Sequence, residues 1–183
     1  MSLTIPTPTV PNALAEATHE TPAFDRLFRD EAPYVGRTLR YLDVEEDQVE
    51  DACQDVFIVV HRRLAEFQGG SLRAWVRQIC VHVANNRRRG RRRRPESTVA
   101  EMPEVAAPAS QLDAAERGQI RERVLSLLDR LSPDQRTVFV LCEIEQLTVV
   151  EASSSIGCPV QTAYSRLHAA RAKVEAALKV GRR

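Results

Sequence analysis

Apolar residues recur every three or four positions along most of this chain, the spacing that gathers them on one face of an α-helix. In the first half, the pattern predicts three helices, over residues 24–42, over residues 49–67 and from residue 72 onward. Amphipathic helices of this length can bury a shared apolar core. That core is predicted to form around Trp75, Phe57 and Phe28.

The ends of these three helices are marked by residues with strong conformational preferences. Pro33 lies inside the first helix, and we expect it to kink or split that helix because proline lacks a backbone N–H and crowds the preceding turn. Gly69–Gly70 is expected to end the second helix, and Ser71 is a plausible N-cap for the third.

Helical spacing returns in the second half of the chain and predicts four further segments. Ser132–Pro133 is a strong helix start, with serine as N-cap and proline at the first helical position. Thr148 is expected to cap a short helix that ends near Gly157, and the last helix begins at Pro159 or Val160. The buried positions are predicted to be Ile120, Val124, Leu127, Leu128, Leu131, Val138, Leu141, Cys142, Ile144, Ala163, Leu167, Ala170, Val174 and Leu178.

The sequence predicts an all-α protein, because no segment carries a β-hairpin signal. Residues 1–22 contain four prolines and are interpreted as a disordered leader. Residues 95–111 contain three prolines, no basic residue and no periodicity, which is typical of a flexible linker. We therefore expect two small helical domains, at 23–94 and 112–183, joined by that linker.

Charge is strongly segregated, although the net charge is only +1. Residues 87–94 contain seven arginines, whereas residues 43–55 contain seven acidic residues and no lysine or arginine. The arginine run continues the third predicted helix with nothing acidic nearby in sequence, so we expect an unburied cationic surface for a polyanion. A solvated basic tail is the alternative. Basic residues also predominate after Gly157, which indicates a second cationic surface.

Several classes of protein do not fit this sequence. The four cysteines are far apart, so we expect Cys53, Cys80 and Cys142 to be small core residues and neither zinc nor another cofactor to bind. An enzyme is the least favoured class, because no catalytic triad, metal cluster or phosphate loop can be assembled. A membrane-length apolar run and a secretory signal are both missing, so we expect a cytoplasmic protein without membrane insertion of its own.

The last two predicted helices, joined by the short turn Ile156–Pro159, have the layout of a helix-turn-helix. The second helix has an apolar stripe and, opposite it, residue types that suit a DNA major groove. A plain helical hairpin with a solvated polar face is the alternative, and the basic charge after Gly157 favours DNA. The candidate DNA contacts are Gln161, Thr162, Tyr164, Ser165, Arg166, His168 and Arg171.

Three stretches of the chain, in order, resemble bacterial sigma factors of the extracytoplasmic-function (ECF, group 4) type. They are VEDACQDVFIVVHRRLAEF, WVRQICVHVANNRRRGRRRR and LSPDQRTVFVLCEIEQLTVVEASSSIGCPVQTAYSRLHAARAKV. The resemblance covers nearly all of residues 24–178, with a linker where larger sigma factors carry another domain. It implies a factor that brings core RNA polymerase to a promoter, with the first domain melting the −10 element and the second domain reading the −35 element.

By position, the resemblance implies that the second helix binds the β′ clamp of the polymerase, while the second domain meets the β flap. A solvated acidic patch is the alternative for Asp51 and Asp55. The polymerase-binding residues implied in this way are Asp51, Gln54, Asp55, Phe57 and Val60.

The same resemblance matches residues 67–71 to a loop that captures a base flipped out of the non-template strand. Base flipping costs a few kcal/mol, which contacts to the flipped base must offset. Trp75 matches a position that the family usually fills with tryptophan, and we expect it in the core. The implied −10 contacts are Phe67, Gln68, Ser71, His82, Asn85, Asn86, Arg87, Arg88 and Arg89.

The chain departs from the family pattern at two places. His82 and Asn86 stand where the family usually has Asn and Asp, which is expected to strengthen phosphate attraction or change the preferred −10 bases. Ser153–Ser155 replaces a stretch usually rich in alanine, leucine or charge. Three serines lower helix propensity, so we expect them to loosen the first helix of the helix-turn-helix and weaken the −35 contact.

Three functional hypotheses remain open from the sequence. The first is a promoter-recognition factor held inactive by an anti-sigma protein that wedges between the domains or covers them. The second is a sigma-like decoy that sequesters an anti-sigma partner without supporting transcription. A simple helix-turn-helix repressor is the third, although it would leave the first domain without a purpose.

Overall fold

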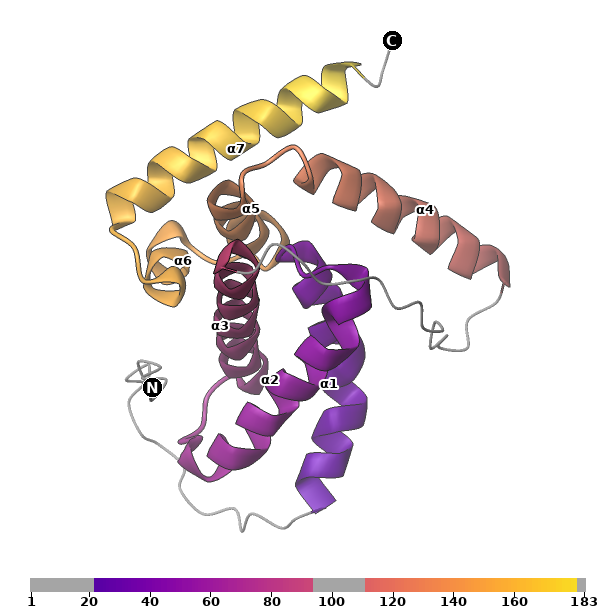
Figure 1. The fold of residues 1–183 in the computed structure, drawn as a ribbon, viewed down its shortest axis with the longest axis vertical. Coiled ribbons are helices and arrows are strands. Elements are labelled where there is room, and N and C mark those ends of the chain that lie inside the picture. The colour runs from indigo at the N-terminus through magenta and orange to yellow at the C-terminus, as the bar shows by residue number, and fades with distance from the viewer. Residues whose placement is uncertain (1–21, 94–110, 181–183) are drawn as a thin grey trace.

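The computed structural model describes residues 22–93 and 111–180 (Figure 1). All of the predicted leader except Pro22, and most of the predicted linker, lie outside the described residues. Over the described ranges the chain is helical and contains no β-strand, which confirms the all-α prediction. In the same ranges, no helix is both long and apolar enough to cross a membrane. The helices are α1 (Pro22–Tyr41), α2 (Val49–Arg63), α3 (Leu72–Arg93), α4 (Gln111–Leu128), α5 (Pro133–Phe139), α6 (Val149–Ile156) and α7 (Val160–Val180).

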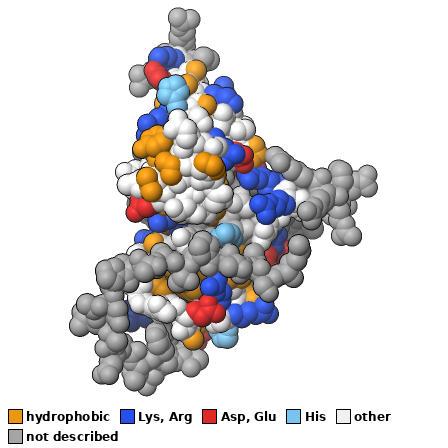
Figure 2. All heavy atoms as spheres, turned by 90° about the vertical axis from the view of Figure 1, so that its left-hand side faces the viewer, with side chains coloured by type: hydrophobic (Ala, Val, Ile, Leu, Met, Phe, Trp, Pro, Cys, Tyr) orange, Lys and Arg blue, Asp and Glu red, His pale blue; other side chains and the backbone are white. Residues whose placement is uncertain are grey.

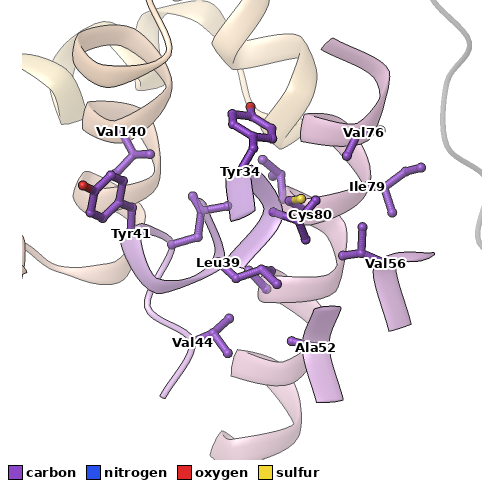
Figure 3. Packing of buried hydrophobic residues seen from close by; sticks show 14 of the residues in the cluster. Tyr34, Leu39, Tyr41, Val44, Ala52, Val56, Val76, Ile79, Cys80 and Val140 are labelled. Atoms are coloured by element: carbon purple, nitrogen blue, oxygen red, sulfur yellow. The ribbon is translucent and has the colours of Figure 1, made fainter. Parts of the chain in front are cut away.

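Helices α1, α2 and α3 pack around one apolar core, to which Leu39, Val56 and Ile79 contribute fully buried side chains (Figure 3). Helix α1 runs unbroken through Pro33, so the expected split does not occur. Tyr34 follows the proline directly and is itself buried in this core. Packing on both sides of the proline therefore holds the helix together despite the missing N–H.

Helix α2 ends earlier than the sequence predicted. It stops at Arg63 and is followed by the 3₁₀ turn η2 (Leu64–Glu66). Gly69 and Gly70 lie beyond this turn with φ of +97° and +94°, so they shape the loop instead of ending the helix. The Ser71 hydroxyl accepts a hydrogen bond from the Ala74 amide at 3.3 Å, which confirms the predicted cap of α3.

The aromatic core differs from the prediction at one residue. Phe57 is buried and Trp75 is partly buried against the core, as expected. Phe28 is 45% exposed, so placing it inside the core was wrong. Its ring packs edge-on against Phe57 with centroids 4.6 Å apart, which leaves its outer face at the surface.

Local capping fixes the ends of the helices in the second half. Ser132 and Gln135 form a reciprocal capping box at the start of α5, and Thr148 and Glu151 form another at the start of α6. Gly157 ends α6 in the left-handed region with φ of +74°. These boundaries confirm the predicted ones. The π-helical turn η3 (Val140–Ile144) between α5 and α6 was not predicted.

The three serines of α6 do not break the helix. Ser153 and Ser155 are buried, and their hydroxyls donate to the carbonyl oxygens of Val150 and Glu151. Each hydroxyl is therefore satisfied within its own helix, which is the bonding available to serine inside a helix. Helix α6 spans Val149–Ile156 without interruption, contrary to the loosening that we expected.

Most of the predicted core positions of the second half are buried or partly buried, but two are not. Ile120, in the middle of α4, and Leu178, near the C-terminal end of α7, are both exposed. The helical spacing identified the correct face, but it could not show where the neighbouring helices end. The buried positions are Leu128, Leu131, Val138, Leu141, Ala163, Leu167 and Ala170.

The cysteines lie as predicted for small core residues. Cys80 is fully buried, and Cys53 and Cys142 are partly buried against the same core. Burial disfavours the thiolate, so it raises the pKa of the Cys53 and Cys142 thiols above the ordinary value. These thiols are therefore expected to be protonated and to act as packing groups.

The two helical groups pack directly against each other. One continuous set of buried residues joins them, and Figure 3 shows Tyr41, near the end of α1, beside Val140 of η3. In Figure 1 the helices of the second half lie along one end of the α1–α3 group. Each half therefore covers part of the surface of the other.

Candidate protein-binding and nucleic-acid interfaces

Helix α2 presents a polar face to the surface. Asp51, Gln54 and Asp55 are all exposed, as the sequence predicted. Asp55 accepts a hydrogen bond at 2.6 Å from the Arg87 guanidinium of α3. This pairing leaves Asp51 and Gln54 as the more accessible polar groups of the face.

Two residues assigned to this surface point the other way. Val60 is fully buried, so it supports α2 from the core and does not reach a partner. Phe57 is almost fully buried and contributes only to the floor of an apolar groove between α1 and α2. Placing these two side chains on the contact surface was therefore a mistake. The groove is lined by Phe24, Phe28, Gln54, Phe57, Ile58, His61 and Arg62.

Ile58 is the apolar surface residue that our sequence analysis missed. It is 47% exposed and lies on the same α2 face as Asp51 and Gln54. Its position was readable, because residues 51, 54 and 58 follow helical spacing on one side. An apolar residue on a polar face marks a candidate contact for another protein.

The loop between η2 and α3 keeps Gln68 and Ser71 at the surface. Phe67 is only partly exposed, because its ring lies 5.5 Å from the Trp75 ring, centroid to centroid. The Ser71 hydroxyl is already engaged as the α3 cap. Gln68 and the edge of Phe67 are thus the groups of this loop best placed to meet a ligand.

The outer half of α3 displays polar side chains of several kinds. Asn86 and Arg89 are exposed, whereas His82 and Asn85 are partly buried. Burial lowers the pKa of His82, and the positive charges of Arg63 and Arg89 lower it further. His82 is therefore neutral at neutral pH and adds hydrogen-bonding capacity there, not charge.

The arginine run is less available than its sequence suggested. Arg87 pairs with Asp55, Arg88 lies 3.2 Å from an Asp134 carboxylate oxygen, and Arg91 pairs with Asp43 and Glu45. The side chain of Arg88 is only 18% exposed. Our expectation that these arginines stay unburied and lack acidic partners was wrong, because folding brings acids from distant parts of the chain to them.

Helix α7 displays the predicted polar face opposite its apolar stripe. Gln161, Tyr164 and His168 are exposed, and Thr162 is partly exposed. The Ser165 hydroxyl donates to the Thr162 carbonyl oxygen at 3.0 Å, so it is satisfied within the helix. The N-terminal part of α7 therefore offers side chains that can both donate and accept hydrogen bonds.

The two arginines predicted on this helix are both paired with acids. Arg166 donates to Asp134 at 2.6 Å, and Arg171 donates to Glu143 at 2.6 Å. On the face of the molecule in Figure 2, Lys and Arg side chains are interspersed with acidic and hydrophobic ones. This face does not present a single cationic surface.

Polar contacts that the sequence did not predict join the two halves. The Tyr34 hydroxyl of α1 donates to Glu145 at 2.7 Å, and burial together with this carboxylate raises the tyrosine pKa. Arg136 of α5 donates to the main-chain oxygens of Arg40 and Tyr41 at 2.8 Å each. No local signal could have revealed these pairs, because about one hundred residues separate the partners in sequence.

Two family models match the chain, one in each half. The model of sigma-70 region 2 matches residues 27–94, and the model of sigma-70 region 4 matches residues 121–174. The first match contains α2, α3 and most of α1. The second contains α5, α6 and most of α7, with the helix-turn-helix.

Two similar proteins are RNA polymerase sigma factors by name. The chain is 31% identical to the RNA polymerase sigma-H factor of Pseudomonas aeruginosa over 169 residues, which are 86% of each protein. It is 30% identical to the ECF RNA polymerase sigma factor SigE of Mycolicibacterium smegmatis, covering 82% of this chain but 59% of that relative.

Two solved structures have a similar fold. The structure of CnrH in complex with the cytosolic domain of CnrY is similar, with a TM-score of 0.60, 26% identity and coverage of 88% of this chain and 90% of that one. The sigma factor RpoE in complex with the anti-sigma factor NepR from Bartonella quintana shares the fold at 24% identity, with a TM-score of 0.60 and coverage of 86% and 98%. The chain thus belongs to the extracytoplasmic-function sigma factors of the sigma-70 family.

Proposed function

We propose that this protein binds core RNA polymerase and directs it to a specific set of promoters in the bacterial cytoplasm. The observation that carries the proposal is the presence of both sigma-70 segments on one chain, region 2 before region 4, each with an exposed polar face. We assign the polar face of α2 to a protein partner and that of α7 to DNA. Promoter targeting requires this combination of contacts.

The polymerase contact is assigned to α2. Asp51 and Gln54 supply a charged and a polar group, and Ile58 supplies apolar area beside them. A mixed surface of this kind suits a protein partner, with the apolar residue contributing affinity and the charges contributing orientation. We assign the basic clamp of the β′ subunit as its partner, and the β flap as the partner of the second half.

The −10 contact is assigned to the Phe67–Ser71 loop and the outer face of α3. Gln68 and Asn86 are exposed polar groups that can bond to base edges or phosphates, and Arg89 is an exposed cation for the phosphate backbone. Arg87 and Arg88 join this surface once their carboxylate partners release them.

The −35 contact is assigned to the N-terminal part of α7. In helix-turn-helix proteins the beginning of the recognition helix reaches the base edges in the major groove. Gln161 and Tyr164 lie there and are exposed, and Gln161 has the bidentate amide that pairs well with adenine.

An anti-sigma protein is the proposed regulator. Two of the similar solved structures are complexes, one of CnrH with the cytosolic domain of CnrY and one of the sigma factor RpoE with the anti-sigma factor NepR. The apolar groove between α1 and α2 is a surface that such a partner could cover. The decoy hypothesis is not favoured, because the similar proteins are RNA polymerase sigma factors by name.

A charge reversal on α2 tests the polymerase contact. Asp51→Lys should weaken binding to purified core polymerase by at least about tenfold, because it faces the basic clamp with a like charge. Glu122→Lys makes the same charge change at an exposed position of α4, away from the proposed surface, and should bind like the unmodified protein. Equal affinity for the two variants would reject the assignment of α2.

A further inference from the structure

The first turns of α7 expose apolar side chains as well as polar ones. Val160, the first residue of the helix, is 39% exposed, and Tyr164, one turn later, is 51% exposed. Residues four apart are neighbours on the surface of a helix, so these two side chains form one short apolar strip. Val160 was not among the candidate DNA contacts.

The turn of the helix-turn-helix fixes where this strip lies. Gly157 ends α6 with φ of +74°, and the Pro159 carbonyl oxygen accepts the bond that starts α7, from the Ala163 amide at 3.1 Å. Ala163 and Leu167 are buried and anchor these turns to the rest of the second half. Val160 therefore lies at the beginning of the recognition helix, which is the part that reaches base edges in helix-turn-helix proteins.

The polar neighbours of the strip differ in how free they are to meet DNA. Gln161 is exposed and carries an amide that can bond to a base edge. The two arginines farther along the helix are engaged with acids, since Arg166 donates to Asp134 and Arg171 donates to Glu143. Base reading by the start of α7 therefore depends on an amide and on apolar side chains more than on arginine.

An apolar strip on a DNA-reading face has a clear chemical counterpart in the major groove. Thymine presents its 5-methyl group there, and apolar side chains recognise thymine by contact with that methyl. The contact removes the methyl group and the side chain from water, and burying one methyl group changes an equilibrium constant about fourfold. Such a contact needs no hydrogen bond and no charge.

We propose that Val160 and Tyr164 read a thymine of the −35 element through its 5-methyl group. The strip is continuous with the face that carries Gln161, so both contacts are made from the same two turns of α7. An apolar contact adds sequence preference without adding salt-dependent attraction to phosphates. The inference rests on the proposed function, because that function places the start of α7 in the major groove of the −35 element.

The experiment uses the full-length chain bound to core polymerase. A −35 sequence is first selected from a randomised promoter library with this complex. Each thymine of the selected −35 duplex is then replaced, one at a time, by uracil, which lacks only the 5-methyl group and pairs in the same way. Replacement at the thymine that the strip contacts should weaken binding by about threefold to fivefold.

Variants of the strip show whether it reads this methyl group. Val160→Ala removes two methyl groups from an exposed position and should bind the thymine and uracil duplexes nearly equally, because the two losses share one contact. Leu178→Ala is the matched control, since it removes apolar area from an exposed position near the other end of α7 and should keep the full thymine preference. Tyr164→Phe keeps the ring and should keep the preference, whereas Tyr164→Ser should reduce it.

Four results would overturn the inference. The first is a selected −35 element without thymine, and the second is equal binding of thymine and uracil duplexes by the wild type. The third is a thymine preference that Val160→Ala and Tyr164→Ser retain in full. The fourth is loss of the preference in Tyr164→Phe, which would assign the contact to the hydroxyl group.

The same experiment distinguishes this inference from the proposed function. A polymerase complex that selects no −35 sequence would reject both. A complex that selects a −35 sequence but is insensitive to the methyl groups would leave the proposed function standing and reject the thymine contact alone.

Discussion

At the scale of single residues, the environment decides what each arginine can do. Arg89 and Arg88 are neighbours in sequence, yet Arg89 is exposed while Arg88 lies against Asp134 from the other half. The composition of the run predicts cationic character, but only the fold shows which charges are already neutralised. Exposed and paired arginines should therefore respond differently to substitution.

Arg89→Ala should weaken binding to duplex DNA and reduce the slope of log affinity against log salt concentration by about one. The reason is that an exposed guanidinium can bind a phosphate without first breaking an ion pair. Arg88→Ala should have a smaller effect in the free chain, since Arg88 must first leave Asp134. Equilibrium binding over a salt series measures both. A larger loss for Arg88→Ala than for Arg89→Ala would contradict this ranking.

Gln161→Ala should change the preferred −35 sequence more than the overall affinity. A bidentate amide contact to a base is worth about 1–3 kcal/mol of discrimination, whereas it contributes little to phosphate attraction. Selection from a randomised −35 library in the presence of polymerase measures the preference. Glu175→Gln, at an exposed position of α7 outside the candidate DNA contacts, is the control and should leave the preference unchanged. Identical selected sequences for Gln161→Ala and wild type would exclude Gln161 from base reading.

His82 should make the protein less stable in acid. Its pKa is lowered in the folded chain by burial and by two nearby arginines, so the unfolded chain binds the proton first as pH falls. Stability is therefore fully present above the ordinary histidine pKa of about 6.5 and decreases as pH drops below it. Denaturant unfolding across this pH range should show that the free energy of unfolding falls less steeply for His82→Gln than for the wild type. An equal fall in the two proteins would show that protonation of His82 does not destabilise the fold.

At the scale of secondary structure, the helix boundaries were predictable where the signal is local. Ser132, Thr148 and Gly157 act through their own backbone neighbourhood, and all three boundaries were found correctly. The end of α2 was missed because residues 64–67 continue the apolar spacing although the chain there forms the 3₁₀ turn η2. Periodicity alone does not distinguish a helix from a tighter turn that keeps facing the core.

Thr148→Ala should destabilise the second half by about 1 kcal/mol, because the amide of Glu151 loses its capping oxygen. The same change should weaken −35 recognition, since α6 supports the recognition helix. Ser154→Ala is the control within the same helix, at an exposed position where alanine is a better helix former. Denaturant unfolding distinguishes them, and equal stabilities would mean that the capping box is dispensable.

At the scale of the whole molecule, the division into two helical groups followed from the sequence but their contact did not. Tyr34 with Glu145 and Arg136 with Tyr41 join residues about one hundred positions apart. Neither pair can be predicted from local periodicity, composition or charge. The acidic and basic segments looked like surfaces for external partners, and the structure instead pairs part of them with each other.

The measurement that tests the central claim most directly is transcription in vitro from a randomised promoter library, with purified core polymerase and this protein as its sole initiation factor. We predict transcripts enriched for one −35 and one −10 sequence at a fixed spacing, dependent on added protein and reduced by Asp51→Lys. Transcripts that are absent, or that show no sequence enrichment although the protein binds polymerase, would contradict the account.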